Sequence, residues 1–556
     1  MLDENLPIHD VLIIGAGPCG LAVAARLCEP LPSALFTENE HQKFHLLRSS
    51  TQRRWKATRT SRRSNIGTDQ LLSGPCVSSD RLDIKVLDAD GDTWMNAWNE
   101  KFESLNISHL RSPMFFHPDP RDRDGLLAFA FMNKKENELK EIQGVVGKEL
   151  SKHHRKKKQK GGKRIQETTY IDERNRQDYF RPSQALFRDY CQEIVQRYGL
   201  SDIVEKSQVM SIVYDNPTSV FTIEASTGTK KARTVVLAIG SGQTPCLPQD
   251  SPFHNIPNPQ NVTHIFSHLN LDSSTILAPS VLASTSFDHP KILAIIGGGL
   301  TSAQIAELAS SQGLSKVHLI LRSPLKTKHF DVDLCWLAKY KNESMSRFWK
   351  ADEDRERWEM MRDARGGGSV NPEYREVLKT LVREGRVKVW EWTKVKGARW
   401  DDEQERWRLE LTDTTEEVHQ VDVDGVVYAT SEAADIRTVN VVRSILEEHP
   451  IEIVGGLPCL TNELMWNEDI PLFVTGKLGG LRLGPAAPNL EGARLGAEFI
   501  SSKIAILSSG WQRGVKDSDE SPAEEFDMGR LGLGRSNQFE ILEYDSEEGG
   551  NVHSVF

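Results

Sequence analysis

The chain has 556 residues, and at roughly 100–200 residues per domain this length predicts about three domains or two large ones. Lys and Arg total 69 against 79 Asp and Glu, so the formal net charge is −10. This balance argues against a nucleic-acid-binding protein, which needs a basic surface. The apolar share of 38% lies slightly below the globular norm and indicates that part of the chain is not folded core.

The cysteine pattern excludes further classes. Seven cysteines are scattered along the chain without a C-x-x-C pair, which argues against a disulfide scaffold, a clustered zinc or iron–sulfur site and a dithiol redox centre. No apolar run reaches the roughly 18–20 residues that span a bilayer, and the acidic N-terminus lacks the features of a secretory signal. We therefore expect a cytoplasmic protein with no membrane association.

The first element with chemical meaning lies near the N-terminus. An apolar strand over residues 10–14 is followed at once by a G-x-G-x-x-G turn and a helix over residues 21–27. This is the order of a dinucleotide-binding βαβ unit, whose glycines permit the tight turn, the approach of a pyrophosphate and close packing of helix on strand. The helix N-terminus offers free N–H groups to the phosphates. The residues of this turn that we predict to bind a cofactor are Gly15, Gly17, Pro18, Cys19 and Gly20.

A second strand is expected over residues 33–37, and it ends at Glu38, about twenty residues after the turn. Such units carry an acid at this place for the ribose hydroxyls, so we predict that Glu38 binds the ribose of the first dinucleotide.

The next distinctive segment, residues 133–177, is rich in Lys, Glu and Gln and contains the basic run Lys152–Arg164. It has too little apolar surface to offset its ordering entropy, so we expect a disordered surface insertion. A nuclear-localisation or polyanion-binding role for the run is the alternative. The acidic tail from residue 509 onward is expected to be disordered as well.

A second unit of the same kind occurs in mid-chain. A strand over residues 291–296 leads into a Gly297-Gly298-Gly299 turn and a helix, with Ser302 at the place of the third glycine. The following strand, residues 316–321, ends in Arg322, which suits a 2′-phosphate and favours NADP over NAD. Lys326 and Lys328 are expected to add positive charge. The residues of this unit that we predict to bind a cofactor are Gly297, Gly299, Thr301, Ser302, Gln304 and Arg322.

The two units differ in one respect that assigns their ligands. The N-terminal unit ends in an acid and the mid-chain unit in an arginine, which predicts two different dinucleotides. FAD in the first and NADPH in the second is the economical assignment.

Several further segments carry a family resemblance. They are Leu110–Met114 with His117–Pro120, Tyr179–Ser183 before Leu186–Cys191, Thr234–Gly240, Asp424–Thr430, and Phe473–Gly476 with Leu483–Ala493. With the two dinucleotide units, they make the chain resemble the two-dinucleotide-binding flavoprotein monooxygenases over roughly residues 8–510. Within that superfamily it is similar to the N-hydroxylating ornithine and lysine monooxygenases and, more closely, to oxidative stress-induced growth inhibitor-like proteins.

The resemblance implies further cofactor contacts. It places Arg111 in a loop over the flavin, and it places Gly476, Pro485, Asn489 and Leu490 in the C-terminal segment that meets the isoalloxazine. A turn that opens a helix there would aim N–H groups at the flavin edge.

Differences from the motifs of these families narrow the possible enzyme class. Ser431 and Glu432 stand where the N-hydroxylases usually have Gly and Tyr. The Baeyer–Villiger fingerprint F-x-G-x-x-x-H is missing around His264 and His268, and the absent C-x-x-C argues against the disulfide-reductase branch.

The predicted fold class is α/β, with two Rossmann-like dinucleotide-binding domains, the FAD domain split in sequence and the NADP domain inserted into it. The predicted boundaries are 1–132 for the first part of the FAD domain, 133–177 for the basic insertion, 178–288 for the continued FAD domain and linker, 289–435 for the NADP domain with an aromatic-rich insertion, 436–508 for the return to the FAD domain and 509–556 for the acidic tail.

The predicted function is an FAD-dependent, NADPH-using monooxygenase that hydroxylates a small molecule, an amine or a secondary metabolite, with O2. By resemblance the reaction runs through a flavin hydroperoxide, so the cofactor carries the difficult step and no side chain is predicted as a catalytic acid or base. A regulatory flavoprotein acting by protein contacts, or an uncoupled NADPH oxidase, is the alternative. No metal or nucleic-acid partner is expected, and the oligomeric state is left open.

Overall fold

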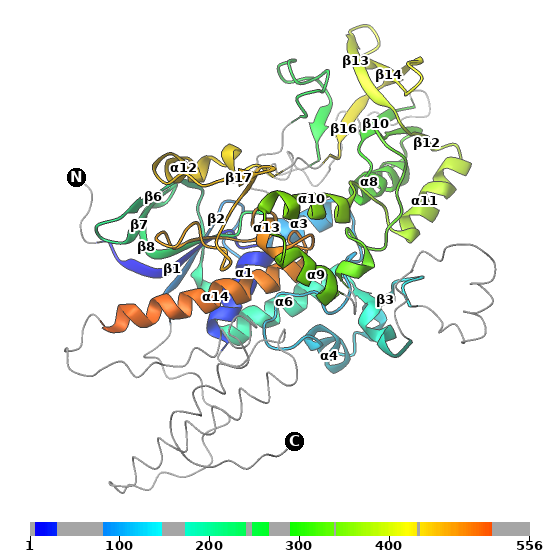
Figure 1. Cartoon of the computed structure of the whole chain (residues 1–556). Coiled ribbons are helices and arrows are strands. Elements are labelled where there is room, and N and C mark those ends of the chain that lie inside the picture. The colour runs from blue at the N-terminus through cyan, green and yellow to red at the C-terminus, as the bar shows by residue number, and fades with distance from the viewer. Residues whose placement is uncertain are drawn as a thin grey trace, which may run out of the picture.

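Two sheets, each with its own helices, organise the chain in the computed structural model (Figure 1). The structure describes residues 6–29, 82–146, 173–240, 247–265, 290–337, 341–430 and 434–513. No helix within these stretches is long and apolar enough to cross a membrane. We call the part built on the larger sheet the larger unit, and the part built on the five-stranded sheet the smaller unit.

The larger sheet has the order β5-β2-β1-β8-β7-β6, and β19 pairs with the C-terminal end of β8. The strands β5, β2, β1, β8 and β19 run parallel, whereas β6, β7 and β8 form an antiparallel meander. Val11, Leu12 and Ile13 of the central β1 are completely buried, as in a parallel strand covered on both faces. The strands are β1 (Ile8–Ile14), β2 (Ile84–Asp88), β5 (Val204–Lys206), β6 (Val209–Asp215), β7 (Val220–Ala225), β8 (Gly228–Leu237) and β19 (Leu472–Val474).

The first and last described helices of the chain, α1 (Pro18–Cys28) and α14 (Leu490–Arg513), pack against each other in the larger unit (Figure 1). The small Ala22 and Ala24 of α1 are fully buried and permit a close approach. Arg26 Nε donates to the buried carboxylate of Glu498 at 2.8 Å. The C-terminal part of the chain therefore returns to the larger sheet. Further helices of this unit are α3 (Asn96–Ser104), α4 (Gly125–Met132), α6 (Gln184–Tyr198) and α12 (Arg443–Glu448).

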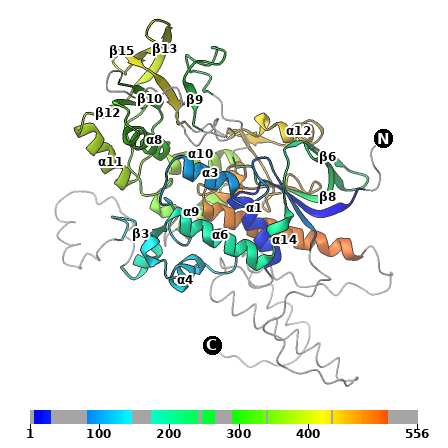
Figure 2. The ribbon, with the colours of Figure 1, turned by 180° about the vertical axis from the view of Figure 1, so that it is seen from behind.

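The smaller unit is a parallel sheet of order β12-β11-β10-β16-β9 (Figure 2). One core joins it to α8 and α11, and another joins it to an antiparallel sheet of β13, β14 and β15. The fold class predicted from the sequence is thus confirmed. The elements are β9 (Val262–His264), β10 (Ile292–Ile296), α8 (Leu300–Ser311), β11 (Lys316–Ile320), α11 (Pro372–Arg383), β12 (Val387–Trp390), β13 (Lys394–Asp401), β14 (Arg406–Thr412), β15 (Val418–Val423) and β16 (Gly425–Tyr428).

Two segments pack differently from the predicted boundaries. The helices α9 (Lys341–Trp349) and α10 (Asp354–Arg365), expected in the second dinucleotide domain, bury Phe348 and Met361 in the core of the larger unit. They contact α13 (Gly480–Leu483), where Arg482 Nη2 donates to Asp354 Oδ2 at 3.0 Å. Conversely, β9 was expected in the first domain or linker but forms an edge of the smaller sheet. Chain order alone did not reveal these exchanges.

Part of the segment predicted to be a disordered insertion, residues 133–177, forms regular structure. Its N-terminal part contains β3 (Leu139–Glu141), which pairs with β4 (Phe180–Pro182). The basic run Lys152–Arg164 lies outside the described residues. At the other end of the chain, α14 continues past the predicted boundary at residue 508, and residues 514–556 are not described.

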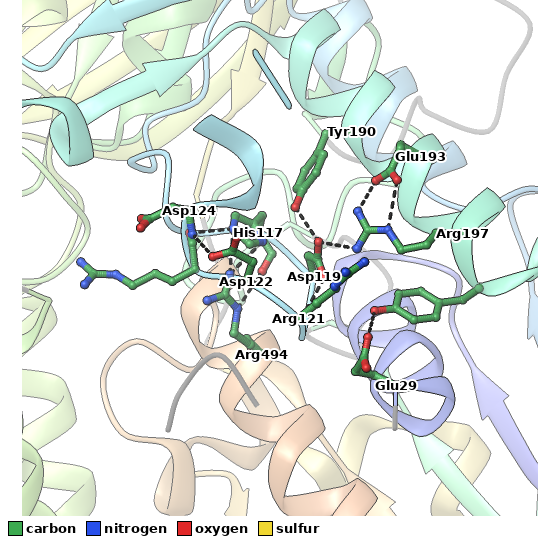
Figure 3. A network of polar contacts seen from close by, with 12 residues as sticks. Glu29, His117, Asp119, Arg121, Asp122, Asp124, Tyr190, Glu193, Arg197 and Arg494 are labelled. Atoms are coloured by element: carbon green, nitrogen blue, oxygen red, sulfur yellow. Dashed lines mark hydrogen bonds and ion pairs between the residues drawn. The ribbon is translucent and has the colours of Figure 1, made fainter. Parts of the chain in front are cut away.

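A buried ionic network fixes the His117–Pro120 segment to α6 and α14 (Figure 3). Asp119 Oδ2 accepts hydrogen bonds from Tyr190 Oη at 2.6 Å and from Arg197 Nη1 at 2.7 Å. His117 Nε2 lies 3.0 Å from the carbonyl of Arg123, and Arg494 Nη2 of α14 lies 2.7 Å from His117 Nδ1. The His117–Pro120 segment, which resembled part of a flavin loop, therefore connects α6 and α14 within the larger unit.

The same network keeps His117 uncharged. Burial, and then the neighbouring Arg494, hold its pKa well below the ordinary 6.5. An arginine that donates to Nδ1 needs that nitrogen without a proton.

This predicts an acid-sensitive fold. In the unfolded chain His117 binds a proton near pH 6.5, whereas in the folded chain it does not, so stability is full above that pH and falls below it. Between pH 7.5 and 5.5 the wild type should lose about 1.4 kcal/mol more unfolding free energy than His117→Gln. Urea unfolding at both pH values measures this, and equal losses in the two proteins would contradict it.

Candidate active site

The two units meet at one large cavity of about 2120 Å³. Ligand pockets usually measure about 300–1,000 Å³, so this space can hold more than one cofactor-sized molecule. Its walls include both glycine-rich turns, the loop after α3, the first turns of α8 and α11 and the start of α14. The predicted cofactor-binding residues that line it are Gly15, Gly17, Pro18, Cys19, Arg111, Gly297, Gly299, Thr301, Gln304, Arg322, Asn489 and Leu490.

The first glycine turn has the geometry that a pyrophosphate needs. Gly15 has φ +108°, and a Cβ there would lie 2.6 Å from the carbonyl oxygen of Ala238 at the end of β8. A Cβ on Gly20 would lie 2.1 Å from Gly15 O, so the helix packs directly on the turn. A Cβ on Gly17 would meet no atom within 4 Å, because this backbone faces the open cavity. The residues present therefore fit a bound dinucleotide.

The second turn repeats this arrangement. Gly297 has φ +153°, and a Cβ there would lie 2.4 Å from the carbonyl oxygen of Ala429, while Gly299 is open. Ser302 is buried, and its Oγ donates to Gly299 O at 2.6 Å. Serine thus replaces the third glycine by bonding to the turn instead of clashing with it.

The structure offers a second candidate for the acid of the first unit. Glu38 and the strand expected before it lie outside the described residues. The two neighbours of β1 in the sheet are β2 and β8. The strand in that place, β2, ends at Asp88, which lines the cavity and accepts from Ala16 N at 2.7 Å. Asp88 is therefore a further candidate for the ribose-binding acid beside Glu38.

Cys19 lies near the start of α1, in the cavity wall. Burial raises the pKa of its thiol to about 12, with a smaller opposing effect of a hydrogen bond to Thr475. The thiol is therefore protonated at neutral pH and is not a nucleophile.

Arg322 follows β11 and lines the cavity. Lys394 and Lys396, at the start of β13, line it as well. Sequence reasoning missed the two β13 lysines, because they lie about seventy residues further along the chain. The lysines that it named instead have another role. Lys326 Nζ donates to Gly366 O at 2.6 Å and Lys328 Nζ to Ala364 O at 3.1 Å, so they bind the last carbonyls of α10.

Arg111 lines the cavity, but all three nitrogen atoms of its guanidinium group donate hydrogen bonds to acceptors within the protein. Nε donates to His329 O, Nη1 to Asp331 Oδ1 and Ser369 O, and Nη2 to Lys328 O, Phe330 O and Ser369 Oγ. The N–H groups of this guanidinium are thus taken up by protein acceptors, which argues against the expected direct hydrogen bond to a flavin.

The remaining C-terminal residues divide into two groups. Asn489 and Leu490 line the cavity at the start of α14. Gly476 and Pro485 lie behind the wall: Gly476 sits against Cys19 with φ +70°, and Pro485 O accepts from Arg365 Nη1 at 3.2 Å.

Further polar side chains in the wall were not predicted. Tyr374 of α11 faces α8, and burial, followed by the carboxylate of Glu307, raises the pKa of its hydroxyl. Burial and Arg181 lower the pKa of the His109 imidazole. No sequence motif marks these residues, because they come from elements far apart in the chain.

Comparison with known proteins agrees with a site for two dinucleotides. Residues 167–431 match the family model described as L-lysine 6-monooxygenase/L-ornithine 5-monooxygenase. No curated protein sequence matches the chain.

Several solved structures share the fold. The ornithine hydroxylase of Pseudomonas aeruginosa is 17% identical, with 90% of this chain and 99% of that chain covered and a TM-score of 0.56. The FAD-bound cadaverine monooxygenase of Erwinia amylovora is 15% identical, with 93% and 98% covered and a TM-score of 0.58. The ornithine N-hydroxylase of Kutzneria, solved with reduced FAD, NADP+ and L-ornithine, is 16% identical, with 90% and 100% covered and a TM-score of 0.57.

The fold and the two glycine turns define a two-dinucleotide-binding flavoprotein. The family match supports the resemblance to flavin-dependent monooxygenases and, with it, the prediction of an enzyme that uses FAD and NADPH.

A matched pair of variants tests the first glycine turn. Gly17→Ala should fold normally, because its methyl group meets no atom, but it should weaken FAD binding at least about tenfold by filling the space that the pyrophosphate approaches. Gly20→Ala should instead lower the melting temperature of the apoprotein, since its Cβ would clash with Gly15 O. The FAD-to-protein ratio and thermal unfolding measure both. Full FAD occupancy in Gly17→Ala would contradict this assignment.

A second prediction concerns Arg322. Arg322→Ala should raise KM for NADPH about tenfold to a hundredfold and leave KM for NADH nearly unchanged, because only NADPH carries the 2′-phosphate. Lys316→Ala, at the other end of the same strand, is the matched control. Equal effects of Arg322→Ala on both nucleotides would remove the phosphate role.

Proposed function

We propose that this protein is an N-hydroxylating monooxygenase that uses FAD, NADPH and O2 to oxidise a small amine. The observation that carries the proposal is the single cavity onto which both glycine turns open. Two dinucleotides that share one cavity can exchange a hydride, whereas separate pockets could not support that reaction.

The residues divide between the two cofactors. The turn from Gly15 to Gly20 and the carboxylate of Asp88 would hold FAD, and the turn from Gly297 to Ser302 with Arg322 would hold NADPH. When bound, NADPH supplies a hydride and FAD the activation of O2, so the protein contributes binding, orientation and the exclusion of water.

A further stretch of the wall of the same cavity suits the amine. It is lined by one face of α8, including Gln304, Glu307 and Ser311, and by Tyr374 and Val377 of α11. A carboxylate in this wall attracts a cationic group, which favours a substrate with an ammonium group over an acidic one. Recognition of a diamine or a basic amino acid would agree with the matched family.

The regulatory alternative is not favoured, because the family match lies with enzymes and both turns keep cofactor-binding geometry. The uncoupled oxidase is an outcome of the following experiment.

The purified protein should be yellow and should consume NADPH and O2 faster in the presence of its amine. Oxygen uptake is measured with 1,5-diaminopentane, L-ornithine, L-lysine and the acidic control L-glutamate, and the product is checked for one added oxygen by mass spectrometry. Colourless protein that binds no added FAD would overturn the proposal. Hydrogen peroxide equal to the NADPH consumed, with every amine, would establish the uncoupled oxidase instead.

A further inference from the structure

The loop that follows α3 contacts both units through its own side chains, independently of any bound cofactor. Leu105 and Ile107 of this loop pack into the core of the smaller unit. The next part of the loop is tied to the larger unit, because Leu110 N donates to Pro182 O at 3.0 Å. Arg111 therefore lies where the two units join.

Its guanidinium reaches two loops of the mid-chain segment at once. One is residues 328–331, which follow Arg322 along the chain, and the hydrogen bonds to it include Nη1 to Asp331 Oδ1 at 2.6 Å and Nη2 to Lys328 O at 2.8 Å. The other is Ser369, whose carbonyl oxygen and Oγ both accept, at 3.3 and 3.1 Å.

These two loops are joined to each other. Lys328 N donates to Val370 O at 3.0 Å, and Val370 N donates to Lys326 O at 2.9 Å. A shift of one loop must therefore move the other.

The joined loops touch the turn that would hold NADPH. A Cβ on Gly368 would lie 2.9 Å from Gly298 C, Gly298 O and Gly299 N, so the backbone before Ser369 rests directly on the second glycine turn. Arg111 is thus linked through Ser369 to that turn, and through residues 328–331 to the segment that begins at Arg322.

A lysine could not make this connection. The acceptors surround a planar fork with five N–H groups, whereas an ammonium offers three donors from a single nitrogen. The side chain is 13% exposed, so few of the lost hydrogen bonds would be replaced by bulk water.

We propose that Arg111 is a positioning residue that sets the second dinucleotide site against the flavin. This inference rests on the proposed function, and it assigns Arg111 to NADPH placement rather than to FAD binding. Losing the fork should weaken NADP+ binding and slow flavin reduction, while FAD stays bound and the reduced flavin reacts with O2 as before.

The test is Arg111→Lys in the FAD-loaded, full-length protein. We expect at least a tenfold higher Kd for NADP+ by calorimetry and at least a tenfold slower anaerobic reduction by NADPH, followed by the flavin absorbance. The FAD-to-protein ratio and the rate of reoxidation by O2 should stay within twofold of the wild type. Arg26→Lys is the matched control, since that partly buried, ion-paired arginine contacts Glu498 and the carbonyl of Glu29 in the larger unit and does not line the cavity.

A second variant covers the case in which Arg111→Lys does not fold. Asp331→Asn combined with Ser369→Ala removes the charged partner and one hydroxyl from the mid-chain side and should shift Kd and reduction rate in the same direction by a smaller factor.

The inference would be overturned if the wild type binds NADP+ and is reduced by NADPH, and a folded variant shows the same Kd and the same reduction rate. So would a loss of FAD in proportion to the loss of reduction, which would mean a direct flavin contact. A wild-type protein that NADPH does not reduce would instead refute the proposed function, and that outcome is distinguished before any variant is measured.

Discussion

The closeness of backbone to backbone at the two glycine turns is the constraint on which the rest of the site depends. Gly15 presses against the end of β8 at Ala238, and Gly297 presses against the end of β16 at Ala429. Each turn thereby places its next glycine, Gly17 or Gly299, at the open cavity with no side chain in the way. Any side chain at the first position would push the turn out of the sheet edge and close the space that a pyrophosphate needs.

The two turns share a cavity only because the units are held in one arrangement. The loop from Leu105 to Arg111 belongs to both: its apolar residues enter the core of the smaller unit, and its arginine binds two loops of the mid-chain segment. On the larger side, the Asp119–Arg197 ion pair and the hydrogen bonds from Arg494 to His117 fix the continuation of the same loop to α6 and α14. Packing and charge thus support a site whose chemistry belongs to its cofactors.

Local patterns predicted the parts of this site that local physics determines. Strand, glycine turn and helix were correctly placed in both units because turn chemistry and periodicity depend on adjacent residues. Residue partners remote in sequence could not be predicted. Asp88 was missed because some fifty residues separate α1 from β2, and the acceptors of Arg111 lie more than two hundred residues away. Lys326 and Lys328 had the charge expected of phosphate ligands, but sequence does not reveal that the end of α10 lies within their reach.

The raised pKa of Cys19 has a chemical consequence for the oxygen reaction that we propose for this cavity. Peroxide oxidises the thiolate, and burial raises the pKa of the Cys19 thiol to about 12, so the thiolate is scarce at pH 7. The protonated thiol of Cys19 should therefore resist oxidation by any peroxide that the proposed reaction releases. The burial of Cys19 in the first glycine turn would thus also protect its thiol from the proposed reaction with O2.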